Sequence, residues 1–125
     1  MQYHPPSSVA VLSRRKGGIL RHVGLLLPDG RVAHCSPGHG EHISPVEEFS
    51  DGQDVTIERL LTPGESAVTM HRISQAVSAS HAYDALTNNC EIFAHRMIGE
   101  IPVSPQLQSM AVLVGLAALL RVSAR

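Results

Sequence analysis

Residues 19–35, ILRHVGLLLPDGRVAHC, form the stretch that decides the fold. Residues 19–27 are strongly apolar, and His22 is one of only three interruptions in this run. The sequence Pro28-Asp29-Gly30 predicts a tight turn, because proline presets φ and glycine tolerates a positive φ. Since residues 31–35 return as a second extended run, the pattern predicts a β-hairpin.

The segments on either side of this hairpin predict more strands. Residues 9–12 predict a short strand that ends at a basic turn over residues 13–18. Residues 35–40 are rich in Ser, Pro and Gly and predict a loop, whereas residues 54–58 alternate like a half-buried strand.

Two helices are expected in the second half of the chain. Apolar residues recur at helical spacing over residues 65–79. A second helix is predicted over residues 90–98, with Asn88 or Asn89 as its N-cap and Gly99 at its end. With strands in the first half and helices in the second, the expected fold class is α+β.

Composition limits the kinds of function. The chain has 125 residues, enough for one domain, and a formal net charge of -1, which does not favour nucleic acid as a partner. The first residues lack the charged start and apolar run of a secretory signal, so the cytoplasm is the expected location. In that reducing compartment Cys35 and Cys90 are both expected to be free thiols.

The C-terminal residues 106–125 differ from the rest of the chain. Residues 110–120 contain no polar side chain, but a helix of that length spans roughly 16 Å, short of the roughly 30 Å of a bilayer core. We expect a catalytic domain over residues 1–105, followed by an apolar helix or tail over residues 106–125. That tail is either a core helix or a segment that contacts a membrane surface or another copy through residues 107–122.

Cys90 has the surroundings expected of a nucleophile. A thiol in the first turn of a helix faces backbone N–H groups and the positive end of the helix dipole, which are expected to lower its pKa. Such a thiol needs a base, and His22 lies in an apolar strand, where an imidazole has no packing reason to be. His34, across the hairpin, could orient His22 as the third member of a triad. A buried histidine bonded to a backbone carbonyl is the alternative for His22.

These motifs resemble one family. The segments His22-Val23-Gly24, 29–34 (DGRVAH) and Asn89-Cys90-Glu91-Ile92-Phe93 are similar in order and spacing to the lecithin:retinol acyltransferase-like family. That family is a permuted branch of the NlpC-type, papain-like superfamily. The similarity covers roughly residues 8–99, and Ile92 departs from the family, which often has His there.

The resemblance implies that Cys90 is the nucleophile, His22 the general base and His34 the residue that orients His22. It also implies a small antiparallel β-sheet packed against helices, with the Cys90 helix on the strands that carry the two histidines. It implies a phospholipase A or acyltransferase-like enzyme that acts through a Cys thioester on acyl lipids, without a cofactor. A cysteine peptidase or amidase of NlpC type uses the same residues and stays an alternative, with a peptide as substrate.

Two further hypotheses come from other classes of protein. Residues 34–42, HCSPGHGEH, gather His, Cys and Glu side chains that could bind zinc, although their spacing matches no common zinc framework. The second hypothesis is a non-enzymatic interaction module that uses the apolar tail. We favour the enzyme and expect no metal.

Overall fold

The computed structural model describes residues 8–17 and 20–99. Its fold is α+β, with one five-stranded antiparallel sheet in the order β4-β3-β2-β1-β5. The predicted C-terminal helix lies outside the described residues. The elements in chain order are β1 (Ala10–Gly17), β2 (Leu20–Leu26), β3 (Val32–Ser36), β4 (Gly40–Ser44), α1 (Val46–Ser50), β5 (Val55–Leu60), α2 (Pro63–Ala79) and α3 (Cys90–Ile98).

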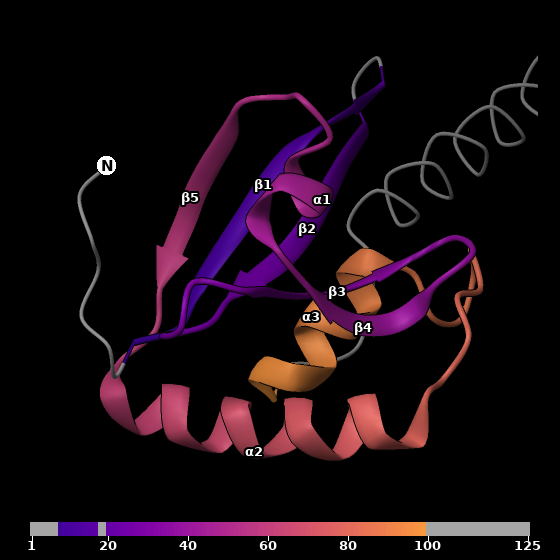
Figure 1. Ribbon diagram of the computed structural model, residues 1–125. Coiled ribbons are helices and arrows are strands. Elements are labelled where there is room, and N and C mark those ends of the chain that lie inside the picture. Colours follow the sequence, from indigo (N-terminus) through magenta and orange to yellow (C-terminus); the bar gives the residue numbers. More distant parts are fainter. Residues whose placement is uncertain (1–7, 18–19, 100–125) are drawn as a thin grey trace, which may run out of the picture.

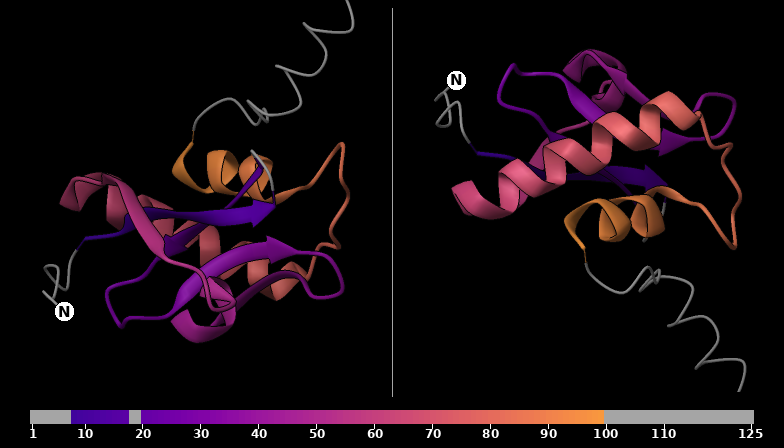
Figure 2. Two further views of the ribbon diagram at one scale, coloured as in Figure 1. Left: turned by 90° about the horizontal axis from the view of Figure 1, so that it is seen from above. Right: turned by 90° about the horizontal axis from the view of Figure 1, so that it is seen from below.

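The sheet separates two hydrophobic clusters. Figure 2 shows α3 on one side of the strands and α1 on the other, and in Figure 1 α2 runs along one end of the sheet. The first cluster joins residues of α2 and α3, among them Ile73 and Phe93, to alternate residues of β2 and β3. The second places Phe49 of α1 on the remaining residues of these strands. Alternation along the strands therefore decides which side chains face α3 and which face α1.

The predicted hairpin is confirmed, but its strands part early. Gly30 has φ +89°, as the turn requires, and β2 and β3 are antiparallel. Their pairing consists of Leu25 with Ala33 and Leu26 with Val32. Beyond Leu25 the two strands diverge, so that the edge of β2 around residues 21–23 is not paired with β3. We call this opening the β2–β3 split.

Two expectations about residues 8–60 are wrong, and one helix was missed. The predicted basic turn 13–18 is strand as far as Gly17, because β1 pairs with β2 on one edge and β5 on the other. The predicted loop 35–40 contains the end of β3 and the start of β4, whose pairing with β3 had no local sequence signal. The short helix α1 was not predicted either, and its one fully buried residue is Phe49.

The two predicted helices are confirmed. α2 begins after Thr62, which forms a capping box with Glu65. α3 begins at Cys90, with the Asn89 side chain accepting a hydrogen bond from the Ile92 N–H, and ends at Gly99. Among the helices of the described residues, none has both the length and the apolar character needed to span a bilayer.

Candidate active site

Two buried histidines form a hydrogen-bonded chain on the α1 face of the sheet. His22 Nε2 lies 2.9 Å from His34 Nδ1, and His34 Nε2 lies 2.8 Å from Ser44 Oγ. Phe49 packs on both imidazoles, with ring centroids 5.2 Å from His22 and 5.3 Å from His34. Gly24 makes this packing possible, because a Cβ there would lie 2.6 Å from a ring carbon of Phe49. The structure therefore brings together the predicted base and its predicted orienting partner.

These hydrogen bonds favour one tautomer for each ring. Ser44 donates its one hydroxyl hydrogen to the carbonyl oxygen of Pro45, at 3.0 Å, so its oxygen accepts from His34 Nε2–H. His34 Nδ1 then has a lone pair and accepts from His22 Nε2–H. His22 Nδ1 is consequently the nitrogen with a free lone pair, the form that a general base requires.

Burial keeps both imidazoles neutral. It is the largest cause that lowers the pKa of His22 to about 3 and that of His34 to about 4. For His22 the neighbouring His34 and Arg14 lower the pKa further. These shifts exclude a permanently charged imidazolium, but a pKa of about 3 makes His22 a weak base near pH 7, so the pKa values do not support its role as a base.

Cys90 begins α3 on the opposite face of the sheet from the His22 ring. Its side chain is buried in the cluster that contains Val23, and the thiol contacts the backbone of β2 in the β2–β3 split. Sγ lies 3.8 Å from the carbonyl oxygen of Arg21, and the Val23 N–H is its other β2 partner. The thiol thus contacts the strand on both sides of His22. Among the described residues, no hydrogen bond joins this thiol to the imidazole.

The expectation that the helix start lowers the pKa of Cys90 is wrong in its net direction. Burial raises the pKa of this thiol, and hydrogen bonding to the Val23 N–H and the charge of Lys16 oppose that rise without reversing it. The same effect raises the pKa of Cys35 to about 12, with the nearby Glu41 charge adding to it. Both thiols are free, as predicted, and both are protonated near neutral pH.

A buried polar network, which sequence reasoning missed, anchors the start of α3. Glu41 of β4 has a fully buried carboxylate that accepts from Arg96 Nη1 at 2.9 Å and from Asn88 Nδ2 at 2.7 Å. Asn88 Oδ1 accepts a second bond from Arg96 Nη1, at 2.9 Å. His81 completes the network, with Nδ1 3.3 Å from Glu41. No local pattern in the sequence marks Glu41 as buried, because β4 does not alternate between buried and exposed residues.

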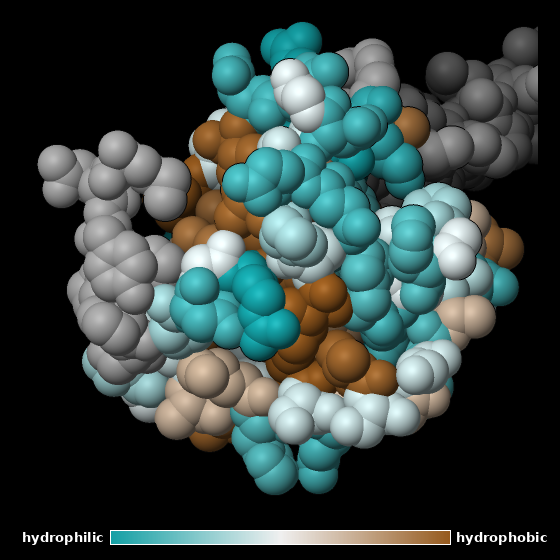
Figure 3. Space-filling view, viewed as in Figure 1, coloured by the Kyte–Doolittle hydropathy of each residue, from teal (hydrophilic) through white to brown (hydrophobic). Residues whose placement is uncertain are grey.

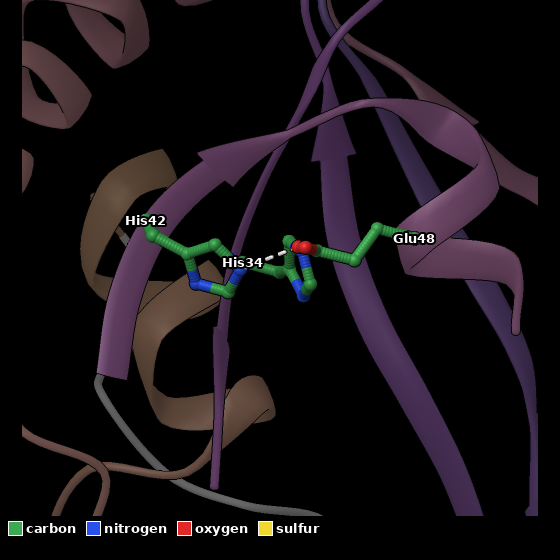
Figure 4. A group of neighbouring side chains, drawn as sticks. All are labelled: His34, His42 and Glu48. Carbon is green, nitrogen blue, oxygen red and sulfur yellow. Dashed lines mark hydrogen bonds and ion pairs between the residues drawn. The ribbon is translucent and has the colours of Figure 1, made fainter. Parts of the chain in front are cut away.

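The residues of the hypothetical zinc loop separate between the two faces. Cys35 lies in the cluster that contains Cys90, and Glu41 is bound in the Arg96 network. His34 and His42 are paired across β3 and β4 and share the α1 face, where Glu48 joins them (Figure 4). The predicted loop is therefore not one ligand set, but two of its histidines meet a carboxylate from α1.

Two hollows lie near these elements. A groove of about 260 Å³ runs beside α3, with an apolar part made by Val11, Val23, Ala94 and Ile98 and with charged groups at Arg21 and Glu91. It shares Arg21 and Val23 with the surroundings of the Cys90 thiol. The other hollow, of about 410 Å³, lies between α2 and the strands, where Figure 3 shows an apolar patch. Its apolar lining is Leu27, Pro28, Ile43, Met70, Ile73 and Val77.

No protein-family model matches the chain, and no curated protein matches it.

Proposed function

We propose that this protein is a thiol-dependent acyl hydrolase or acyltransferase in which Cys90 is the nucleophile, His22 its general base and His34 the residue that orients His22. The observation that carries the proposal is the chain from Ser44 through His34 to His22. It leaves a free lone pair on His22 Nδ1, in the strand whose backbone the Cys90 thiol contacts. The similarity to the lecithin:retinol acyltransferase-like family supports the same three roles.

The raised pKa of Cys90 favours one order of events. Because the thiol is protonated at rest, its proton moves to His22 Nδ1 as sulfur attacks the acyl carbonyl, rather than before substrate binds. The thiol and the imidazole lie on opposite faces of β2, so this transfer requires β2 to rearrange at the β2–β3 split when substrate binds. The first turn of α3 then offers its positive dipole end to the developing oxyanion.

The remaining steps follow from the same residues. His22 returns the proton to the leaving alcohol or amine as the C–O or C–N bond breaks, and Cys90 is left as a thioester. Water or a second alcohol or amine then attacks the thioester, giving up its proton to His22, and the thiol is restored. The groove beside α3 is lined by both apolar and charged side chains, which suits a lipid acyl chain with a polar head group.

The test is a search for an adduct on Cys90. The full chain is incubated with isotope-labelled phosphatidylcholine vesicles, and separately with small peptide amides, and is then examined by intact and tryptic mass spectrometry. We expect a thioester on Cys90 with the phospholipid, absent in Cys90→Ser and retained in the matched Cys35→Ser variant. His22→Ala should slow its formation strongly.

The outcomes separate the alternatives. An adduct with peptides alone would replace the lipid enzyme by a cysteine peptidase or amidase. Two results together would overturn the enzyme and favour an interaction module. These are the absence of an adduct with any ester or amide, and an alkylation rate of Cys90 that is the same in wild type and His22→Ala.

A further inference from the structure

The cluster of His34, His42 and Glu48 shares His34 with the histidine pair, whereas His42 and Glu48 take no part in the proposed reaction. Its side chains come from β3, β4 and α1, and their ligand atoms all lie within 4.8 Å of one another (Figure 4). The His34 and His42 rings have centroids 4.3 Å apart, and Glu48 Oε2 lies 2.9 Å from His42 Nε2 and 3.8 Å from His34 Nε2.

From this geometry we propose that His34 Nε2, His42 Nε2 and the Glu48 carboxylate bind zinc or a similar divalent metal ion. The bound ion would prevent His22 from acting as the general base. Two imidazoles and a carboxylate are a ligand set that zinc accepts, with bonds of about 2.0–2.1 Å, so tetrahedral ligand atoms lie roughly 3.3 Å apart. Glu48 Oε2 lies 2.9 Å from His42 Nε2 and 3.8 Å from His34 Nε2, so one observed distance is shorter and the other longer than about 3.3 Å. Small side-chain movements would therefore complete the site.

Access and charge set the expected affinity. The Glu48 side chain is 47% exposed and that of His42 19%, whereas His34 is buried, so the cation would enter from solvent on the Glu48 side. The Arg14 guanidinium, which is close enough to lower the pKa of His34, opposes a cation, and the Glu48 carboxylate favours one. We expect binding at micromolar rather than nanomolar zinc.

The consequence for the active site rests on the proposed function. A metal needs the lone pair of His34 Nε2, which in the metal-free chain carries the hydrogen donated to Ser44. Metal binding therefore moves that hydrogen to His34 Nδ1, which then donates to His22 Nε2. His22 must in turn carry its own hydrogen on Nδ1, and the lone pair that would take the Cys90 proton is lost.

The first experiment measures binding alone. Zinc is titrated calorimetrically into the full, untagged chain after chelator treatment, and into His42→Ala, Glu48→Gln and Cys90→Ser. We expect one zinc per wild-type chain, a dissociation constant weakened about tenfold or more in His42→Ala and Glu48→Gln, and unchanged binding in Cys90→Ser. No binding at micromolar zinc, or equal binding in all four proteins, would overturn the site.

The second experiment measures the switch. Alkylation of Cys90 is timed with and without saturating zinc, and the ratio of the two rates is taken for each variant, so that any change in the basal rate cancels. Zinc should slow wild type about tenfold or more, because a base in the wrong tautomer loses most of its effect, and the ratio should return towards one in His42→Ala. A wild-type ratio of one beside confirmed binding would overturn the switch and leave the metal site standing. If His22→Ala alkylates as fast as wild type without zinc, the proposed base fails, while calorimetry still decides the site.

Discussion

Replacing Glu41 by leucine should show how strongly the buried network holds the start of α3. The carboxylate is fully buried and accepts from Arg96, Asn88 and His81. Removing one partner of a buried ion pair costs about 3–5 kcal/mol, because the other charge is left unpaired. The Arg96 side chain is 29% exposed and keeps its bond to Asn88, so the low end, about 3 kcal/mol, applies.

That loss is large enough to measure by urea unfolding followed by circular dichroism. It corresponds to roughly a 100-fold larger unfolding constant and to a fall in melting temperature of about 12 °C or more. Arg59→Met is the matched control, since the Arg59–Glu65 pair has side chains 44% and 39% exposed, and its loss should cost less than about 1 kcal/mol.

A second variant keeps this prediction testable if Glu41→Leu unfolds. In Glu41→Leu/Arg96→Met no charge is left unpaired, so the double variant should be at least as stable as Glu41→Leu alone. Additive losses, or a loss below about 1 kcal/mol for Glu41→Leu, would refute the assignment of Glu41 as the anchor of α3.

Three further predictions follow from the same geometry. Burial raises the pKa of Cys35 to about 12, so in folded Cys90→Ser at pH 8 this thiol should be alkylated about 1000-fold more slowly than a thiol with the ordinary pKa of 9.0. Tryptic mass spectrometry measures the rate, and a rate near that of free cysteine would contradict the prediction. Gly24→Ala should lower the free energy of unfolding by about 1–3 kcal/mol, since its Cβ would meet the Phe49 ring. Gly64→Ala, in the first turn of α2 with nothing within 4 Å of the new Cβ, should be neutral or stabilising, and equal effects of the two variants in urea unfolding would refute the packing. Chelator-treated protein should lose stability as the pH falls from 8 to 5, because His22 and His34 have folded pKa values below the unfolded value of 6.5 and the unfolded chain takes up more protons. The loss is about 2 kcal/mol for each histidine, and a flat profile in urea unfolding would show that the rings are not buried neutral.

Local signals were enough to predict the elements that carry the proposed chemistry. The Pro28-Asp29-Gly30 turn presets its own backbone angles, and Asn89 and Gly99 mark the two ends of α3, so the hairpin and the Cys90 helix could be located from the sequence. The pairing of His22 with His34 also followed, because side chains on the two strands of a hairpin meet across it.

The tertiary structure alone decided how these parts meet. Residues 40–50 have no strong periodicity, so their sequence alone predicts neither β4 nor α1. β4 forms because it pairs with β3 and Ser44 bonds to His34, and α1 is held by the packing of Phe49 on the histidine rings. The bond between Glu41 and Arg96 spans 55 positions and depends on sheet register, which local sequence does not encode. The net pKa of Cys90 depends on burial by distant segments, and for that reason the helix start alone predicted the wrong direction.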